Sequence, residues 1–162
     1  PLTRRAGARL TLHGTIPFSA SAAATIDGIH LTDGTNPSLA RLWREQRKVV
    51  GRSIHAVAQA KAADPAQLDY LVVGPVYESA SKPGYGPALG PDGLAAFARS
   101  TSLPVIAIGG VEPVHVGALM KAGAAGVAWP ASGIAAAVRM SRERENDVML
   151  GLRLRATIFR TR

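Results

Sequence analysis

The fold is decided by a strand that opens into a glycine-rich loop, where the chain reads Tyr70-Leu-Val-Val-Gly-Pro-Val-Tyr-Glu-Ser-Ala-Ser-Lys-Pro-Gly-Tyr-Gly86. Its apolar start, Leu71 to Val73, is typical of a strand buried on both faces. The loop that follows carries a lysine, Lys82, among glycine, proline and serine residues. Such a strand end is typical of the side of a parallel sheet that faces a ligand.

Two later strands end in the same way. Pro104-Val-Ile-Ala-Ile108 runs into Gly109-Gly110, and Ala125-Gly-Val-Ala128 is followed by Ser132-Gly133. Glycines allow a close backbone approach and present N–H groups to an anion. The three strand ends together predict one phosphate-binding mouth, and a Gly-Gly pair needed only for tight packing is the alternative.

The whole chain alternates short apolar strands with helical segments. The expected strands cover 9–13, 27–31, 48–53, 68–73, 105–108 and 124–128, and the expected helices cover 18–24, 36–46, 55–63, 92–100, 112–122 and a segment from about 132. Apolar strands without alternation indicate a parallel sheet covered on both faces. Because polar residues follow several strands, and no G-x-G-x-x-G follows the first, a barrel is favoured over an open doubly wound sheet.

The predicted fold class is therefore α/β, a (β/α)8 barrel of the TIM type. A complete barrel takes about 200 residues or more, whereas this chain has 162 and about six readable βα units, so we expect an incomplete barrel. Residues 1–138 form the predicted barrel domain, which lacks the first one or two units, and residues 139–162 form a basic carboxyl-terminal extension. Alternation at 152–158 indicates an extra strand; a basic tail without a role in the site is the favoured alternative.

Composition excludes several classes of protein. There is no cysteine, which excludes disulfides and thiolate metal sites, and no apolar run long enough to cross a membrane. The net charge is +8, but the segments 1–9 and 139–162 carry most of it, with ten arginines against three acids. A nucleic-acid function is therefore not expected, and a cytoplasmic location follows by default.

Individual side chains near the predicted mouth are of types that bind phosphate or transfer protons. Lys82 suits a phosphate or diphosphate clamp, with Ser79 and Ser81 as hydroxyl donors, although a loop lysine is commonly just solvated. His55 follows a strand and can act as an acid, a base or a donor, or can make a structural hydrogen bond. The other histidines, His13, His30 and His115, lack a carboxylate at metal-ligand spacing, so no metal ligand is predicted.

Six segments in one order resemble the thiamine phosphate synthase family, which includes the TenI-type thiazole tautomerases. They are Asp27–Leu31, Gly51–His55, Asp69–Tyr77, Ser79–Lys82, Pro104–Val111 and Ala122–Ala128. The resemblance implies a (β/α)8 barrel that joins hydroxymethylpyrimidine diphosphate to thiazole phosphate and releases diphosphate with Mg²⁺ assistance. It places Ser53 and Lys82 at the diphosphate, with His55 as a third catalytic candidate. The implied phosphate-binding set is Ser79, Ser81, Gly109, Gly110, Ser132 and Gly133.

The chain departs from this family's pattern at three places. His13-Gly14 stands where the family has Asn-Asp, and Thr35 stands where a second Mg²⁺-binding Asp is expected, with Asp33 about two positions early. Mg²⁺ is thus a cofactor by resemblance, with its usual carboxylate ligands absent. The tautomerases use a histidine at a position that holds Pro75 here.

These observations predict a synthase-like transferase of thiamine biosynthesis that takes a phosphorylated small molecule and has no membrane partner. The first alternative is a TenI-like tautomerase or a catalytically degenerate paralogue that binds thiazole phosphate. The second is a non-catalytic protein that binds RNA or a partner through its basic tail. Homo-oligomerisation is left open.

Overall fold

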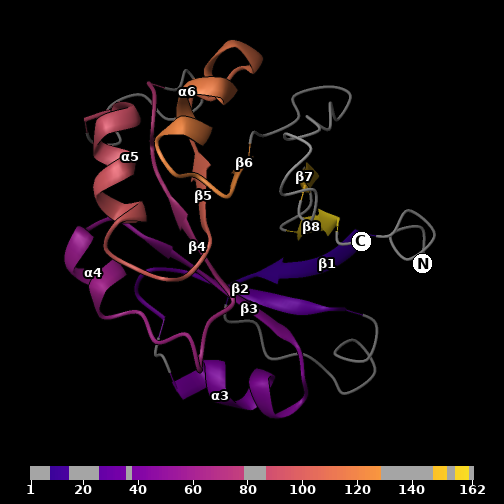
Figure 1. Ribbon diagram of the computed structural model, residues 1–162. Helices are drawn as coiled ribbons and strands as arrows, with labels where there is room; N and C mark the ends of the chain where they lie inside the picture. Colours follow the sequence, from indigo (N-terminus) through magenta and orange to yellow (C-terminus); the bar gives the residue numbers. More distant parts are fainter. Residues whose placement is uncertain are drawn as a thin grey trace.

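The computed structural model of this protein describes residues 8–14, 26–35, 38–78, 87–128, 148–152 and 156–160. Six parallel strands form a curled half-barrel within these ranges (Figure 1). They are β1 (Ala8–His13), β2 (Gly28–Leu31), β3 (Val49–Ile54), β4 (Tyr70–Val73), β5 (Val105–Ile108) and β6 (Gly126–Ala128). Each strand pairs in parallel with the next along the chain. The predicted incomplete (β/α)8 architecture is confirmed.

Helices cover the convex face of this sheet (Figure 1). They are α3 (Ser38–Glu45), α4 (Val57–Lys61), α5 (Gly90–Ala98), the 3-10 turn η1 (Pro113–His115) and α6 (Val116–Lys121). Each lies within a segment predicted to be helical, apart from the first turn of α5. The helices expected at 18–24 and from about 132 lie outside the described residues. None of the described helices is long and apolar enough to cross a membrane.

The core follows the two-residue period of the strands. On β4, Leu71 and Val73 face the helices and belong to the main core, while Tyr70 and Val72 belong to a smaller cluster on the concave face. Leu94 and Phe97 of α5 are buried, as predicted from their spacing.

One prediction about α3 is wrong. The spacing of Leu39, Leu42 and Trp43 predicts one apolar face, but Leu42 is 56% exposed. The residues that face the core are Ala40, which is buried, and Trp43, which packs against the core. These two lie three positions apart, and a helix turns about 100° per residue, so Leu42 cannot share their face fully.

Two aspartates tie the strands together at their amino ends. Asp27, just before β2, accepts the Leu10 N–H of β1 on its Oδ2 atom at 2.8 Å. Asp69, just before β4, accepts the Val50 N–H of β3 on its Oδ2 atom at 2.7 Å. Each carboxylate therefore satisfies a backbone donor at the start of the preceding strand.

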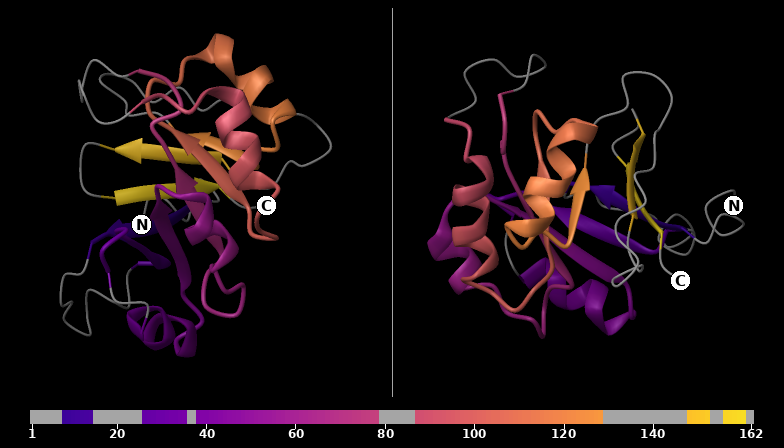
Figure 2. Two further views of the ribbon diagram at one scale, coloured as in Figure 1. Left: turned by 90° about the vertical axis from the view of Figure 1, so that its left-hand side faces the viewer. Right: turned by 45° about the horizontal axis from the view of Figure 1, so that its top comes forward.

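The carboxyl-terminal segment contributes two strands to the same sheet. The strands β7 (Val148–Leu152) and β8 (Ala156–Arg160) pair antiparallel with each other, and β8 pairs antiparallel with β1. The sheet order is β6-β5-β4-β3-β2-β1-β8-β7, and β7 lies in contact with β6 (Figure 2). The alternation at 152–158 therefore indicated strand structure correctly, but its bounds are wrong, because the described residues form two strands, Val148–Leu152 and Ala156–Arg160, in place of one strand over 152–158.

Candidate active site at the carboxyl ends of the strands

The loops after β3, β4 and β5 meet at one edge of the sheet, because parallel strands end on the same side. Ser53 lies near the end of β3, and Gly74 and Gly109 directly follow β4 and β5. The sequence predicts one mouth formed by the loops after β4, β5 and β6, and the loop after β6 lies outside the described residues. We call this edge of the sheet the carboxyl rim.

The loop after β4 crosses directly over the turn after β5. Val76 donates its N–H to the Ile108 carbonyl and Tyr77 donates its N–H to the Gly109 carbonyl, each at 3.0 Å. A Cβ atom on Gly110 would lie 2.2 Å from the carbonyl oxygen of Glu78. Gly110 also has a φ of 61°, in the left-handed region that favours glycine.

Tight packing, the alternative left open for Gly109-Gly110, thus explains why these residues are glycines. A Cβ on Gly109 would lie 2.8 Å from the Cα of Pro75, and Gly109 has a φ of 92°. The same contact constrains the other loop, since a Cβ on Gly74 would lie 2.2 Å from the Ile108 carbonyl oxygen. A role in phosphate binding stays a prediction for both residues of the turn.

Ser53 lies at one end of a chain of side-chain contacts on the concave face. Its Oγ lies 2.9 Å from His30 Nε2, and His30 Nδ1 lies 3.1 Å from the Tyr70 hydroxyl. Tyr70 in turn is hydrogen-bonded to the side chain of Thr11. The chain runs from β1 through β4 and β2 to Ser53 on β3.

Burial keeps His30 and Tyr70, the two middle members of this row of hydrogen-bonded side chains, uncharged. It lowers the pKa of His30 to about 3, with a smaller contribution from repulsion by the neighbouring His13. Burial also raises the pKa of Tyr70, an effect that the Thr11 hydrogen bond opposes and the Asp69 charge assists. His30 is therefore a neutral imidazole and Tyr70 a neutral phenol at physiological pH.

The strand register explains why these residues meet. His13, His30, Gly51 and Tyr70 occupy directly opposed positions on β1 to β4, so their side chains point to the same face. The rings of His13 and His30 stack with centroids 5.3 Å apart, and those of His30 and Tyr70 with centroids 5.5 Å apart. Gly51 supplies the space for the Tyr70 ring.

Sequence reasoning missed this polar layer, although it placed each strand correctly. Spacing alone shows only that His13 and His30 lack a carboxylate for a metal site, and it places Tyr70 inside the strand expected at 68–73 without a role of its own. The available signal was the two-residue period: once the four strands are aligned in parallel, Thr11, His13, His30, Ser53 and Tyr70 fall on one face.

His55 makes the structural contacts that were left open as its alternative. Its Nδ1 lies 3.1 Å from the Gly74 carbonyl oxygen, and its backbone N–H donates to Gln59 Oε1 at 2.8 Å. These contacts join the start of α4 to the end of β4, and the side chain is exposed at the rim. Its catalytic role stays a prediction.

Five predicted site residues lie outside the described residues. They are Lys82, Ser79, Ser81, Ser132 and Gly133. Of the predicted set, the structure therefore describes Ser53, His55, Gly109 and Gly110, all at the carboxyl rim.

The positions that the resemblance assigned to Mg²⁺ do not fit a metal. His13 stacks on His30, and Gly14 has no side chain. Thr35 is buried and its hydroxyl lies 2.7 Å from that of Thr32. Asp33 accepts a hydrogen bond from Gln59 Nε2, and within the described ranges no three His, Asp or Glu side chains gather as a metal site would require.

A family model and individual relatives point to the same family of proteins. A family model described as thiamine monophosphate synthase matches residues 1–132. A putative thiamine-phosphate synthase from Geobacter sulfurreducens is 38% identical over 128 residues, which is 78% of this chain and 59% of that protein. A thiamine-phosphate synthase from Chloroflexus aurantiacus is 33% identical over 135 residues, which is 83% of this chain and 62% of that protein.

Solved structures show the same fold. Thiamine phosphate pyrophosphorylase from Pyrococcus furiosus superposes with a TM-score of 0.53 at 24% identity, covering 67% of this chain and 52% of that one. A FabK mutant from Thermotoga maritima gives a TM-score of 0.59 at 16% identity, covering 87% of this chain and 52% of that one. At these identities the likeness concerns the fold alone. The chain spans 52 to 62% of the length of the first curated relatives it matches.

Proposed function

Because the chain belongs to the thiamine monophosphate synthase family, we propose that it joins hydroxymethylpyrimidine diphosphate to thiazole phosphate. In this reaction the pyrimidine methylene carbon loses diphosphate and forms a bond to the thiazole nitrogen. The observation that carries the proposal is the carboxyl rim, where Ser53 and the loops after β4 and β5 meet.

Ser53 is proposed to donate a hydrogen bond to the leaving diphosphate. Since Tyr70 is a protonated phenol, it can donate to His30 Nδ1, and the neutral imidazole then carries its proton on Nε2. Nε2–H donates to Ser53 Oγ, which leaves the serine proton free to point at an anion. His30 and Tyr70 are positioning residues in this scheme, because they act through Ser53.

Lys82 is proposed to neutralise the developing charge on diphosphate as a point cation. In the sequence it follows β4 by nine residues and lies outside the described residues. Ser79, Ser81, Gly109 and Gly110 come from the same two loops, and with Ser132 and Gly133 they form the proposed thiazole phosphate site. His55, exposed beside Gly74, is the remaining catalytic candidate.

We derive no step through Mg²⁺. The family resemblance implies the ion, but His13, Gly14 and Thr35 offer it no carboxylate. A dependence of the reaction on Mg²⁺ would therefore have to arise from other residues or from the diphosphate itself.

The reaction is tested by incubating the full chain with both substrates over a wide range of Mg²⁺ concentrations and measuring thiamine phosphate. We expect product, and we expect Ser53→Ala to lower kcat about tenfold or more, because it removes a hydrogen bond to a charged group. Ser102→Ala, an exposed serine away from the rim, is the matched control and should retain full activity.

Absence of product at high enzyme concentration would contradict the proposal. Calorimetry with thiazole phosphate, with and without Mg²⁺, then identifies the degenerate alternative, which predicts binding that is indifferent to the metal. A tautomerase is not proposed, because Pro75 supplies no imidazole at the position where that branch uses histidine.

A further inference from the structure

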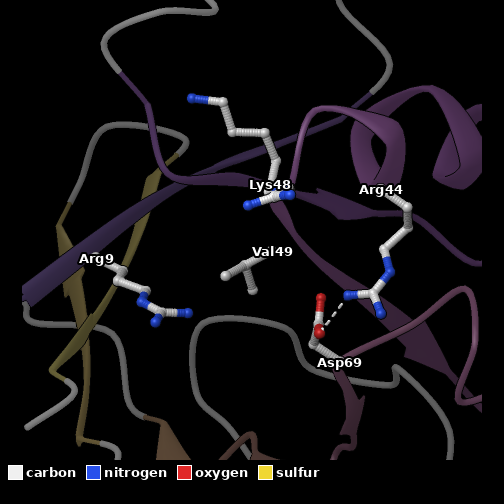
Figure 3. A pocket seen from close by; sticks show the side chains of 6 residues that line it. Arg9, Arg44, Lys48, Val49 and Asp69 are labelled. Carbon is white, nitrogen blue, oxygen red and sulfur yellow. Dashed lines mark hydrogen bonds and ion pairs between the residues drawn. The ribbon is translucent and has the colours of Figure 1, made fainter.

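A hollow of about 310 Å³ opens at the amino ends of the strands (Figure 3). It is lined by Arg9, Arg44, Arg47, Lys48, Val49 and Asp69. Arg9 lies near the start of β1, Val49 begins β3 and Asp69 precedes β4. Because the strands are parallel, this amino-end hollow lies at the opposite end of the sheet from the carboxyl rim.

The lining carries four cationic side chains and one carboxylate. Asp69 is fully engaged, since Oδ1 pairs with Arg44 Nη1 at 2.5 Å and Oδ2 accepts the Val50 N–H. Lys48 donates to the Ile26 carbonyl at 2.6 Å. The side chains of Arg9 and Arg47 make no hydrogen bond or ion pair with any described residue, so within the described ranges no carboxylate compensates these two guanidinium groups.

Basic residues after a helix are ordinarily explained by the helix dipole. That explanation covers Arg44 and Arg47, which lie at and just beyond the end of α3, but it does not cover Arg9 of β1. Arg9 and Arg44 reach toward the hollow from opposite sides, with Val49 between them (Figure 3). Arg47 holds a φ of 56°, which is uncommon for a residue other than glycine, asparagine or aspartate.

We propose that the amino-end hollow binds a small polyanion that bears two or more phosphate groups. Guanidinium groups match phosphate oxygens in a bidentate way, and here they converge from separate elements. The volume suits a small ligand. An RNA strand is less well matched, because single-strand recognition uses aromatic side chains on which bases stack, and the described lining contains none.

The probe is inorganic diphosphate, titrated without metal into the full chain while backbone amide signals are followed by NMR. We expect concentration-dependent shifts at residues 44–49 and at Arg9 and Leu10. In the double variant Arg9→Gln, Arg47→Asn the affinity at these signals should fall about tenfold or more, since two charge-assisted contacts are lost. Asparagine is chosen at 47 because it tolerates the left-handed backbone.

Arg41→Gln is the matched control. Arg41 lies on α3, outside the lining of the hollow, is exposed, and among the described residues pairs with Glu45, so its variant should bind as the parent does. The single variants Arg9→Gln and Arg47→Asn should each lose part of the affinity. They keep the test decisive if the double variant does not fold.

Three results would overturn the proposal: no shifts at residues 44–49, unchanged affinity in the Arg9 and Arg47 variants, or single-stranded RNA bound there that diphosphate does not displace. The inference is independent of the proposed function. The amide signals of Gly109 and Gly110 report on the carboxyl rim, whereas those of residues 44–49 report on the hollow. Loss of the synthase reaction would therefore leave the shifts at the hollow unchanged. Absence of diphosphate binding at the hollow would likewise leave the synthase reaction unchanged.

Discussion

Gly51 is a glycine because the ring of Tyr70 occupies the space that a side chain would need. A Cβ at this position would lie 1.9 Å from the Tyr70 Cζ atom. Tyr70 is buried, and its hydroxyl is hydrogen-bonded to His30. We therefore expect Gly51→Ala to destabilise the protein by about 1–3 kcal/mol, because the buried ring must shift. Urea unfolding measures the change.

Gly117→Ala is the matched control for this prediction. Gly117 lies in α6, and, apart from its chain neighbours and the backbone of its own helix, no atom lies within 4 Å of a Cβ built on it. Alanine there should stabilise the helix by about 0.5–1 kcal/mol, because glycine costs more backbone entropy. Equal effects of the two substitutions would contradict the argument from the Tyr70 ring.

The buried His30 should make the free energy of unfolding depend on pH in the acidic range. Unfolded His30 takes up a proton as pH falls through its ordinary pKa of about 6.5, whereas folded His30 resists protonation until its lowered pKa of about 3. Between these values the unfolded state binds more protons, so stability is lost as pH falls. From pH 7 to pH 4.5 this loss amounts to about 2–3 kcal/mol.

Comparison of the parent with His30→Gln checks this assignment. Urea unfolding at a series of pH values should give a shallower decline for the variant over the same window, because glutamine does not titrate. The same slope in both proteins would show that other groups dominate the acid response.

Among the elements, strand β8 has partners on both sides. Ile158 pairs with Leu10 of β1 and with Leu150 of β7. Ile158→Pro removes an N–H from one of these ladders, so we expect a loss of about 1–3 kcal/mol and faster hydrogen exchange in β1 or β7. Ile158→Val keeps the N–H and should keep the exchange protection of the parent. Unchanged exchange in the proline variant would contradict the pairing.

At the scale of the whole molecule, the sequence predicts the six parallel strands well because each is a short apolar run bounded by glycine or polar residues. It predicts that the loops after β4, β5 and β6 meet, since this follows from parallel order alone, and the structure shows the meeting for the loops after β4 and β5. It does not reveal the contact between Ser53 and His30, which depends on the register of two strands that are 23 residues apart at this contact. The amino-end hollow was missed for a similar reason, because Arg9 and Arg47 are distant in the chain.

The positive charge of residues 139–162 points to the wrong structure for this segment. Its arginines favoured a tail, whereas the alternation of residues 152–158 indicated strand. The structure uses this segment to extend the sheet beyond β1, which composition alone cannot anticipate because net charge carries no information about strand pairing.

The pairing of β1 with β8 has a consequence for synthesis on the ribosome. Ala8 pairs with Arg160, so β1 leaves the ribosome well before β8, the strand that covers its edge. Until then the edge of β1 presents unpaired N–H and C=O groups, which can template association with another chain. A product that terminates before residue 156 keeps this open edge, and we expect such fragments to aggregate more readily than a chain that carries β8.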